Sequence, residues 1–259
     1  MSLLAAERKA LLFTVGGVRL AIRVAQVREI LEVGPGGGDV VARGASYPVA
    51  FVATVLGLRG GDAPFALLTE TVPRAALRVE KVLGIVDLVD AEVFQIPART
   101  RLPQPAPFAG AIVHRGLLAL ELATPAIGWE PLQPASDPDE PPADVGPSGE
   151  PELVFTRGGA RYGVAMSYVT RIVEQPVVAP VPLAPPSHLG LLYEARTLHP
   201  VIDVAGLHGE PVSAIAPRVV LIDAGGTEVA LAADRVERVR AAPEPEGVRR
   251  PAWDLFLGG

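Results

Sequence analysis

The chain has 259 residues, a formal net charge of −6, 49% hydrophobic residues and no cysteine. This length suits about two domains with packed cores, and the hydrophobic content excludes a chain that is disordered throughout. The lack of cysteine excludes disulfides and thiolate metal sites, and the lack of a basic block argues against a general nucleic-acid binder.

The start of the chain predicts neither a signal peptide nor a membrane anchor. Glu7, Arg8 and Lys9 interrupt the first apolar run before it reaches a useful length. No apolar run approaches the roughly 20 residues that a membrane-spanning helix needs. We therefore expect a cytoplasmic protein with no direct membrane insertion.

One sequence unit occurs twice. LLFTVGGVRLAIRVAQVREILE (11–32) aligns without a gap with LVFTRGGARYGVAMSYVTRIVE (153–174). In each copy, residues of alternating character flank a Gly-Gly pair, which predicts two antiparallel strands joined by a hairpin turn. The helical spacing of Val27, Ile30 and Leu31 predicts a brief helical turn after the second strand. The residues that recur at one constant offset are Leu11, Phe13, Thr14, Gly16, Gly17, Arg19, Val27, Ile30 and Glu32.

The two copies continue to match further along the chain. YPVAFVA, from Tyr47, aligns with HPVIDVA, from His199, after a loop that is shorter in the first copy. Residues 65–82 then align with residues 219–236. Short apolar strands between Gly and Pro turns fill both copies, and no long helix is evident. We expect all-β domains that resemble barrels, because closure removes exposed sheet edges.

A Pro-rich and acidic segment separates the copies. EPLQPASDPDEPPADVGPSGE (130–150) has few large apolar residues, so it is expected to be an extended linker. The predicted domains are residues 1–129 and 151–259. The second domain is shortened at its C-terminus, without full closing strands. Trp253 and Phe256 in its tail are expected to fill its barrel or to dock on the other domain.

The sequence contains no recognisable catalytic or metal-binding constellation. Its histidines form no H-x-x-x-H or H-x-H pair, and no phosphate-binding loop or nucleophile elbow occurs. His199 and Asp203 are four residues apart and could form a catalytic pair, but a surface histidine and a structural aspartate are favoured. Asp234-Arg235 and Glu80-Lys81 hold equivalent places in the copies, where a local turn or ion pair is expected. We expect no enzyme activity, no metal and no cofactor.

The order of these motifs resembles the CheW family of bacterial chemotaxis adaptors. The first copy has Gly38, Arg43, Gly44, Pro48 and Val49 at the family spacing, after Val27 and Glu29. Residues 107–122 resemble the closing strands of the family, and residues 181–209 carry Gly190 and the run 200–203. The resemblance implies two CheW-like domains, each a pair of small five-stranded SH3-like β-barrels.

Partners follow from the same resemblance. Members of the family are not enzymes; they connect chemoreceptor cytoplasmic tips to the regulatory domain of a histidine kinase. The resemblance implies binding to either of these, or to other CheW-like domains. The candidate partner-binding residues are Val27, Glu29, Arg43, Gly44, Pro48, Val169, Arg171, Arg196 and Pro200.

Each candidate also has an alternative interpretation, and the second copy departs from the family pattern. Val27 and Val169 are also expected as core residues, and Arg43 as a solvated loop charge. Ala195 and Arg196 replace the Arg-Gly pair of the family, and Arg171 stands where the first copy has Glu29.

Three functions are therefore compatible with the sequence. The first is a tandem scaffold for a chemosensory array. The second is a divergent accessory protein that binds one array partner and modulates or blocks coupling. The third is a small hydrolase or ligand-binding β-barrel, for which the sequence offers no set of converging polar groups.

Overall fold

A computed structural model describes residues 7–34, 36–70, 74–124, 129–146, 149–211, 216–223, 226, 228–240 and 247–253. The fold is all-β, as the sequence predicts, and helices α2 (Val52–Val55) and α3 (Val204–Leu207) span four residues each. Within these ranges no helix has the length and apolarity to cross a membrane.

The chain forms two compact units. It passes from unit 1 to unit 2 between Ala135 and Ser136, inside the segment expected to be a linker. Two short segments belong to the unit opposite to the one expected from their place in the sequence: residues 97–101 belong to unit 2, and residues 181–183 belong to unit 1. Unit 1 comprises Met1–Ile96, Leu102–Ala135 and Val181–Leu183, and unit 2 comprises Pro97–Arg101, Ser136–Pro180 and Ala184–Gly259.

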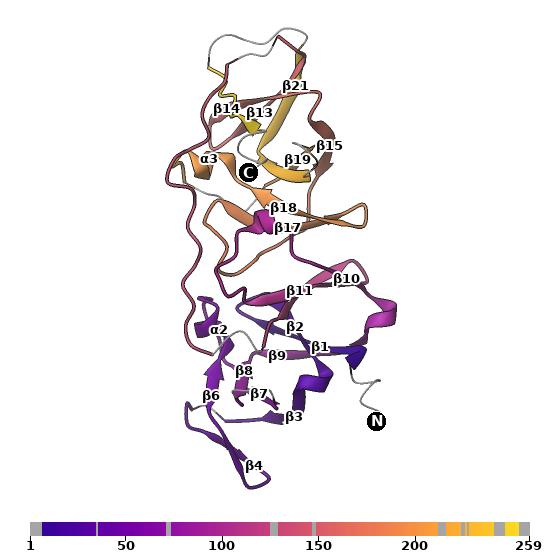
Figure 1. The fold of residues 1–259 in the computed structure, drawn as a ribbon, viewed down its shortest axis with the longest axis vertical. Coiled ribbons are helices and arrows are strands. Elements are labelled where there is room, and N and C mark those ends of the chain that lie inside the picture. The colour runs from indigo at the N-terminus through magenta and orange to yellow at the C-terminus, as the bar shows by residue number, and fades with distance from the viewer. Residues whose placement is uncertain are drawn as a thin grey trace. The chain divides into compact units, whose positions relative to one another are not determined.

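Unit 1 contains a six-stranded sheet in the order β10-β11-β12-β2-β1-β9 (Figure 1). Gly16 and Gly17, with φ of 57° and 78°, form the predicted tight turn between β1 and β2. The hairpin β11–β12 joins this sheet, because β12 pairs in parallel with β2. The strands are β1 (Lys9–Val15), β2 (Val18–Arg23), β9 (Lys81–Asp87), β10 (Glu92–Phe94), β11 (Phe108–His114) and β12 (Leu117–Leu122).

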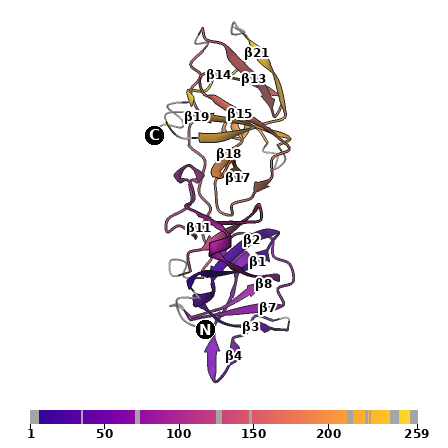
Figure 2. The ribbon, with the colours of Figure 1, turned by 90° about the vertical axis from the view of Figure 1, so that its right-hand side faces the viewer.

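A second sheet of unit 1 has the order β3-β7-β8-β6 (Figure 1). A separate hairpin, β4–β5, projects from this end of the unit (Figures 1 and 2). The strands are β3 (Val27–Glu32), β4 (Val40–Ala42), β5 (Ala45–Tyr47), β6 (Val49–Phe51), β7 (Phe65–Thr69) and β8 (Ala76–Val79).

Unit 2 has a three-stranded sheet, β14-β13-β21, and a six-stranded sheet, β15-β19-β20-β18-β17-β16 (Figure 1). Its main core joins the two sheets through Phe155, Tyr162, Leu231 and Trp253. The strands are β13 (Glu152–Arg157), β14 (Ala160–Ala165), β15 (Val169–Glu174), β16 (Val178–Ala179), β17 (His188–Glu194), β18 (Thr197–Ile202), β19 (Arg218–Asp223), β20 (Glu228–Ala233) and β21 (Arg235–Arg240).

The sequence repeat is also a repeat of strand register. Phe13 pairs with Leu20 in unit 1, and Phe155 pairs with Tyr162 in unit 2. The β1–β9 ladder of unit 1 has a bulge directly before Phe13, and the β13–β21 ladder of unit 2 has one directly before Phe155. Parallel pairing of β6 with β8 likewise recurs as β18 with β20. The ladders give small sheets of SH3-like type, and closure into five-stranded barrels stays a prediction.

The brief helical turn predicted over residues 24–31 is confirmed at its first three residues and is wrong from Val27 on. A 3-10 turn (Val24–Gln26) ends before this residue, and Val27–Glu32 is strand β3, paired with β7. Inward and outward residues alternate along β3, which leaves Ile30 exposed. Pairing with a buried neighbouring strand outweighs the local helical spacing.

Gly190 allows strands β16 and β17 to approach closely. Its φ is +143°, and a Cβ there would lie 2.1 Å from the carbonyl oxygen of Ala179. We expect Gly190→Ala to lower the free energy of unfolding by more than about 2 kcal/mol. Gly226→Ala is the control, because φ is +83° but no atom lies within 4 Å; it should cost about 1 kcal/mol. Equal losses in urea unfolding curves would contradict the steric explanation.

Candidate binding surfaces and the closure of unit 2

The projecting hairpin of unit 1 brings three predicted site residues together. Arg43 and Gly44 form the β4–β5 turn, with φ of 49° and 78°. Arg43 Nε lies 3.1 Å from Oε2 of Glu29 on β3, and the Arg43 side chain remains 68% exposed. An exposed guanidinium held above a strand can be offered to a partner in a defined direction.

Val27 and Pro48 have other places in unit 1. Val27 is half-buried at the start of β3, opposite Thr69. Pro48 is exposed, and its carbonyl accepts a 2.8 Å hydrogen bond from the N–H of Ala76. This bond holds the chain beside β8 where β6 begins.

Unit 2 keeps an ion pair at the equivalent place but reverses its charges. The β17–β18 turn is made by Ala195 and Arg196, with φ of 49° and 64°. Arg171 on β15 takes the position of Glu29, and its Nη1 lies 2.6 Å from Oε1 of Glu194. The charge reversal seen in the sequence is therefore compensated within the unit. Such exposed pairs contribute about 0–1 kcal/mol, so their main effect is on surface charge and side-chain direction.

The remaining candidates of unit 2 differ in exposure. Arg196 is exposed in the turn, and Val169 is half-buried at the start of β15. Pro200 is buried inside the β17–β18 ladder, opposite Leu191. Its side chain packs within the sheet and is not offered to a partner.

A buried charge network in unit 2 was missed by sequence reasoning. Arg157 Nη2 lies 2.6 Å from Oδ2 of Asp203, and both side chains are almost fully buried. Arg157 Nη1 also lies 2.8 Å from the more exposed Asp234. Burial alone would lower the pKa of Arg157, but hydrogen bonds and charge from Asp203 and Asp234 raise the pKa above its usual value.

The network also settles the role of Asp203. Its Oδ1 accepts hydrogen bonds from the N–H groups of Ala205 and Gly206, which caps helix α3. Both carboxylate oxygens are therefore engaged by structural partners. The structural interpretation of Asp203 is favoured over a catalytic pair with His199. The expected surface position of His199 is wrong: the residue is 2% exposed, and its Nε2 lies 3.4 Å from the carbonyl oxygen of Glu194.

A serine, a histidine and an aspartate also meet near the start of β17. Ser187 Oγ donates to Asp137 and lies 3.2 Å from Nδ1 of His188, whose Nε2 lies 2.7 Å from the carbonyl oxygen of Arg99. Ser187 is fully buried, and the aspartate binds the serine rather than the histidine. This order does not activate a nucleophile. Among the described residues, no group of three or more His, Asp or Glu side chains could hold a metal ion.

The free edge of β14 is covered by the tail. Gly163 donates to the carbonyl of Arg249 (2.8 Å), and Arg249 donates to the carbonyl of Arg161 (2.9 Å). Tyr162 and Arg249 form a parallel bridge, as Leu20 and Leu120 do in unit 1. We call residues 249–252 the tail strand; it takes the position of β12.

The expected linker supplies the next strand. Asp144 forms an antiparallel bridge with Pro251, flanked by hydrogen bonds from Val145 N–H to the Arg250 carbonyl (3.0 Å) and from Ala252 N–H to the Ala143 carbonyl (2.9 Å). We call residues 143–145 the linker strand; it lies beside the tail strand as β11 lies beside β12. These two short segments thus take the places that β12 and β11 have in unit 1.

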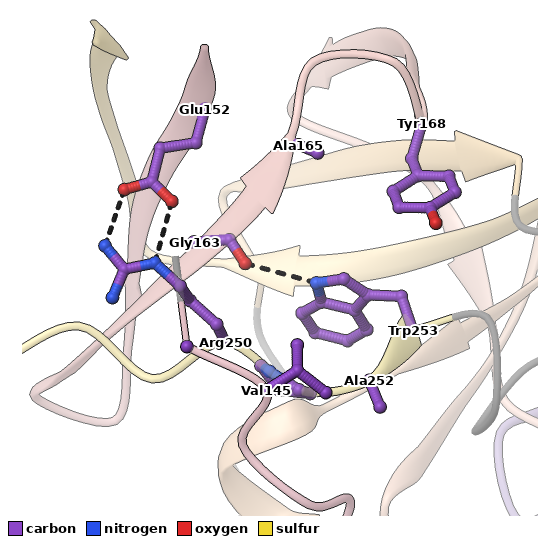
Figure 3. A pocket seen from close by; sticks show the side chains of 10 residues that line it. Val145, Glu152, Gly163, Ala165, Tyr168, Arg250, Ala252 and Trp253 are labelled. Atoms are coloured by element: carbon purple, nitrogen blue, oxygen red, sulfur yellow. Dashed lines mark hydrogen bonds and ion pairs between the residues drawn. The ribbon is translucent and has the colours of Figure 1, made fainter. Parts of the chain in front are cut away.

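A pocket of about 260 Å³ lies under these two strands (Figure 3). Arg250 donates to both carboxylate oxygens of Glu152, at 2.9 and 2.7 Å, and both side chains are buried. Trp253 Nε1 donates to the carbonyl of Gly163 at 3.1 Å (Figure 3). Trp253 therefore fills the core of its own unit, one of the two places expected for it; Phe256 lies outside the described residues. Val145, Tyr168 and Pro251 complete much of the apolar lining.

In unit 1 the closing strand β12 is also held by an ion pair, but the acid and the base have exchanged places relative to unit 2. Glu121 on β12 pairs with Arg23 on β2, with one contact of 2.9 Å. In unit 2 the base is on the closing segment, as Arg250, and the acid is on the sheet, as Glu152. Each closing segment is thus fixed by backbone pairing and by one largely buried ion pair.

Comparison with known proteins gives a family match within the second copy. Residues 152–246 match the family model of the CheW-like domain. No curated protein matches the chain. The crystal structure of the scaffolding protein TtCheW from Thermoanaerobacter tengcongensis is similar with 22% sequence identity and a TM-score of 0.34. That alignment covers 37% of this chain and 66% of TtCheW, just under two thirds of its length.

The buried ion pair gives a stability prediction. Asp203→Asn leaves the buried Arg157 without its closest charge partner and should lower the free energy of unfolding by about 3–5 kcal/mol. Asp234→Asn is the matched control; Asp234 is 44% exposed, so its replacement should cost about 1 kcal/mol or less. Urea unfolding followed by circular dichroism measures both, and similar losses would contradict a dominant role for Asp203.

His188 gives a pH prediction. Burial lowers the pKa of His188 below its ordinary value of 6.5, and burial likewise lowers that of His208. The unfolded chain therefore binds more protons near and below pH 6.5, so stability is complete above this pH and falls as the pH drops. His188→Gln should reduce the difference in unfolding free energy between about pH 7.5 and pH 5.5. An unchanged pH dependence would show that His188 does not contribute.

Proposed function

We propose that this chain, whose residues 152–246 form a CheW-like domain, is a non-enzymatic scaffold of a bacterial chemosensory pathway. The observation that carries the proposal is the family match on unit 2, joined to the repeat of the same strand register in unit 1. On this basis residues 1–129 are a first CheW-like domain, 130–150 connect the copies, and 151–259 are the second. The protein acts in the cytoplasm.

The proposed mechanism is binding without turnover. The β4–β5 hairpin offers Arg43 above Glu29, and the β17–β18 hairpin offers Glu194 beside Arg171. These exposed charges suit a polar interface rim, which governs encounter and partner choice more than affinity. The proposed partners are the regulatory domain of a chemotaxis-type histidine kinase, a chemoreceptor cytoplasmic tip and other CheW-like domains.

The described side chains also favour a binding role over an enzyme. The buried groups that could have formed a site are satisfied by structural partners: Asp203 by Arg157 and the cap of α3, and Glu152 by Arg250. The pocket beside Arg250 therefore presents a neutralised ion pair, and the family itself is non-catalytic.

An accessory role is the second candidate, and the hairpin of unit 2 favours it. Ala195 and Arg196 replace the Arg-Gly turn of unit 1, and the charges of the neighbouring pair are reversed. Because the acid and the base have exchanged places in the hairpin surface of unit 2, a partner that fits the hairpin surface of unit 1 would bind unit 2 less well. One unit would then bind an array component while the other does not complete the bridge to the kinase.

A charge-swap series in the full chain tests the proposed surface. Arg43→Glu should weaken binding to a chemoreceptor tip fragment about tenfold, because it places like charges at the rim. The double variant Glu29→Arg/Arg43→Glu restores an internal pair with the charge order of unit 2. If Arg43 contacts the partner, both variants lose affinity in isothermal titration calorimetry. Binding like wild type by both variants would remove this surface from the proposal.

Kinase activity separates the scaffold from the accessory protein. A reconstituted mixture of receptor fragment, kinase and this chain should show higher kinase activity than one without the chain if it couples the two. Inhibition that requires binding would favour the accessory role. No binding to either component by the folded chain would contradict both.

A further inference from the structure

The acidic segment between the copies is bound to unit 2 at two carboxylates. Asp137 accepts hydrogen bonds from Ser187, through its N–H at 3.1 Å and through its hydroxyl. Asp144 accepts a hydrogen bond from the N–H of Arg250. These two carboxylates therefore fix the segment to unit 2, although residues 139–141 and 143–145 stay exposed.

The tail strand binds the linker strand through its main-chain groups. The N–H of Ala252 and the carbonyl of Arg250 pair with the linker strand on either side of Asp144. The Arg250 guanidinium is already bound to Glu152, so the backbone N–H of Arg250 receives the Asp144 carboxylate. Addition of an extended segment to an open strand edge is a recurring mode of peptide recognition.

The tail strand and the linker strand are held to very different degrees. The tail strand pairs with β14, and Trp253, which follows it, is buried in the core of unit 2 with 3% exposure. In the linker strand, the Val145 side chain is 63% exposed, and pairing rests on two main-chain bonds and one carboxylate. A strand with few buried contacts and exposed hydrogen bonds opens at a lower free energy than the core it covers.

Release of the linker strand would uncover a preformed site. It would free the outer edge of the tail strand and remove Val145 and Gly146 from the wall of the 260 Å³ pocket. What is left is a row of backbone donors and acceptors with an N–H placed for a carboxylate, next to an apolar recess lined by Tyr168 and Trp253.

We propose that this edge of unit 2 is a binding site for an extended acidic peptide, and that the linker occupies it in cis as a built-in competitor. The occupant that the structure displays defines the ligand: an acid that caps the Arg250 N–H, followed by an aliphatic residue over the pocket. The inference is independent of the scaffold role, because the site and its ligand both lie within this chain. Tethering gives the linker strand an effective concentration of order millimolar at this edge. A separate peptide therefore binds tightly only once the linker strand has been released.

The test uses full-length chains and a fluorescein-labelled peptide of residues 136–146, SDPDEPPADVG. The release variant Asp144→Ala/Val145→Pro loses the carboxylate and the Val145 N–H that hold the linker strand. Asp139→Ala is the matched control; it removes one acid from the same segment at an exposed position. Fluorescence anisotropy reports binding, and hydrogen exchange at the Gly163 N–H reports whether the tail strand stays paired with β14.

The release variant should bind the peptide at least about tenfold more tightly than wild type and Asp139→Ala, because the cis competitor is gone. A peptide with Asp144→Ala should lose most of this affinity. Equal binding by all three proteins, or no binding by a release variant whose Gly163 N–H remains protected, would overturn the proposal. Loss of protection at the Gly163 N–H in the release variant would also overturn the proposal. It would show that the tail strand leaves β14 together with the linker strand, so that no preformed site remains.

Discussion

The edge of β14 is the constraint on which the rest of unit 2 depends. A strand that lies over a hydrophobic core cannot leave its N–H and carbonyl groups unpaired without a large desolvation cost. In unit 1 the β11–β12 hairpin satisfies the equivalent edge. Unit 2 meets the same requirement with segments from either side of the domain, the linker strand and the tail strand. Both lie outside residues 152–246, which match the family.

Charge reversal is the second theme that joins the two copies. The closing strand carries the acid in unit 1, as Glu121, and the base in unit 2, as Arg250. The hairpin surface carries the base in unit 1, as Arg43, and the acid in unit 2, as Glu194. An ion pair needs complementary partners but not a particular order, so the internal contacts survive the exchange. On the surface, the more exposed member of the pair is an arginine in both units, but it lies on the β4–β5 turn in unit 1, as Arg43, and on β15 in unit 2, as Arg171.

The units also diverge in their cores. The buried pair Arg157–Asp203 of unit 2 corresponds in sequence to Val15 and Phe51 of unit 1. In unit 1 the Arg78 guanidinium lies 5.6 Å from the ring centre of Phe51 and donates to the backbone carbonyls of Gly34, Gly36 and Ala63. Phe51 is 39% exposed, so unit 1 has an arginine over a partly exposed ring where unit 2 has a buried ion pair. The same architecture therefore tolerates both solutions.

The sequence by itself determined the all-β class, the two copies, the Gly-Gly hairpins and the family resemblance, because these follow from local alternation, turn residues and an ungapped repeat. It also brought Glu29, Arg43 and Gly44 into one candidate site, because family spacing relates them. Only the tertiary structure decided that Val27–Glu32 is a strand, that Arg157 pairs with Asp203, and that Asp144 pairs with the tail. Each of these depends on groups far apart in the chain. Pairing across such distances is decided by which strand edges and charges must be satisfied in the folded state, and no local pattern encodes it.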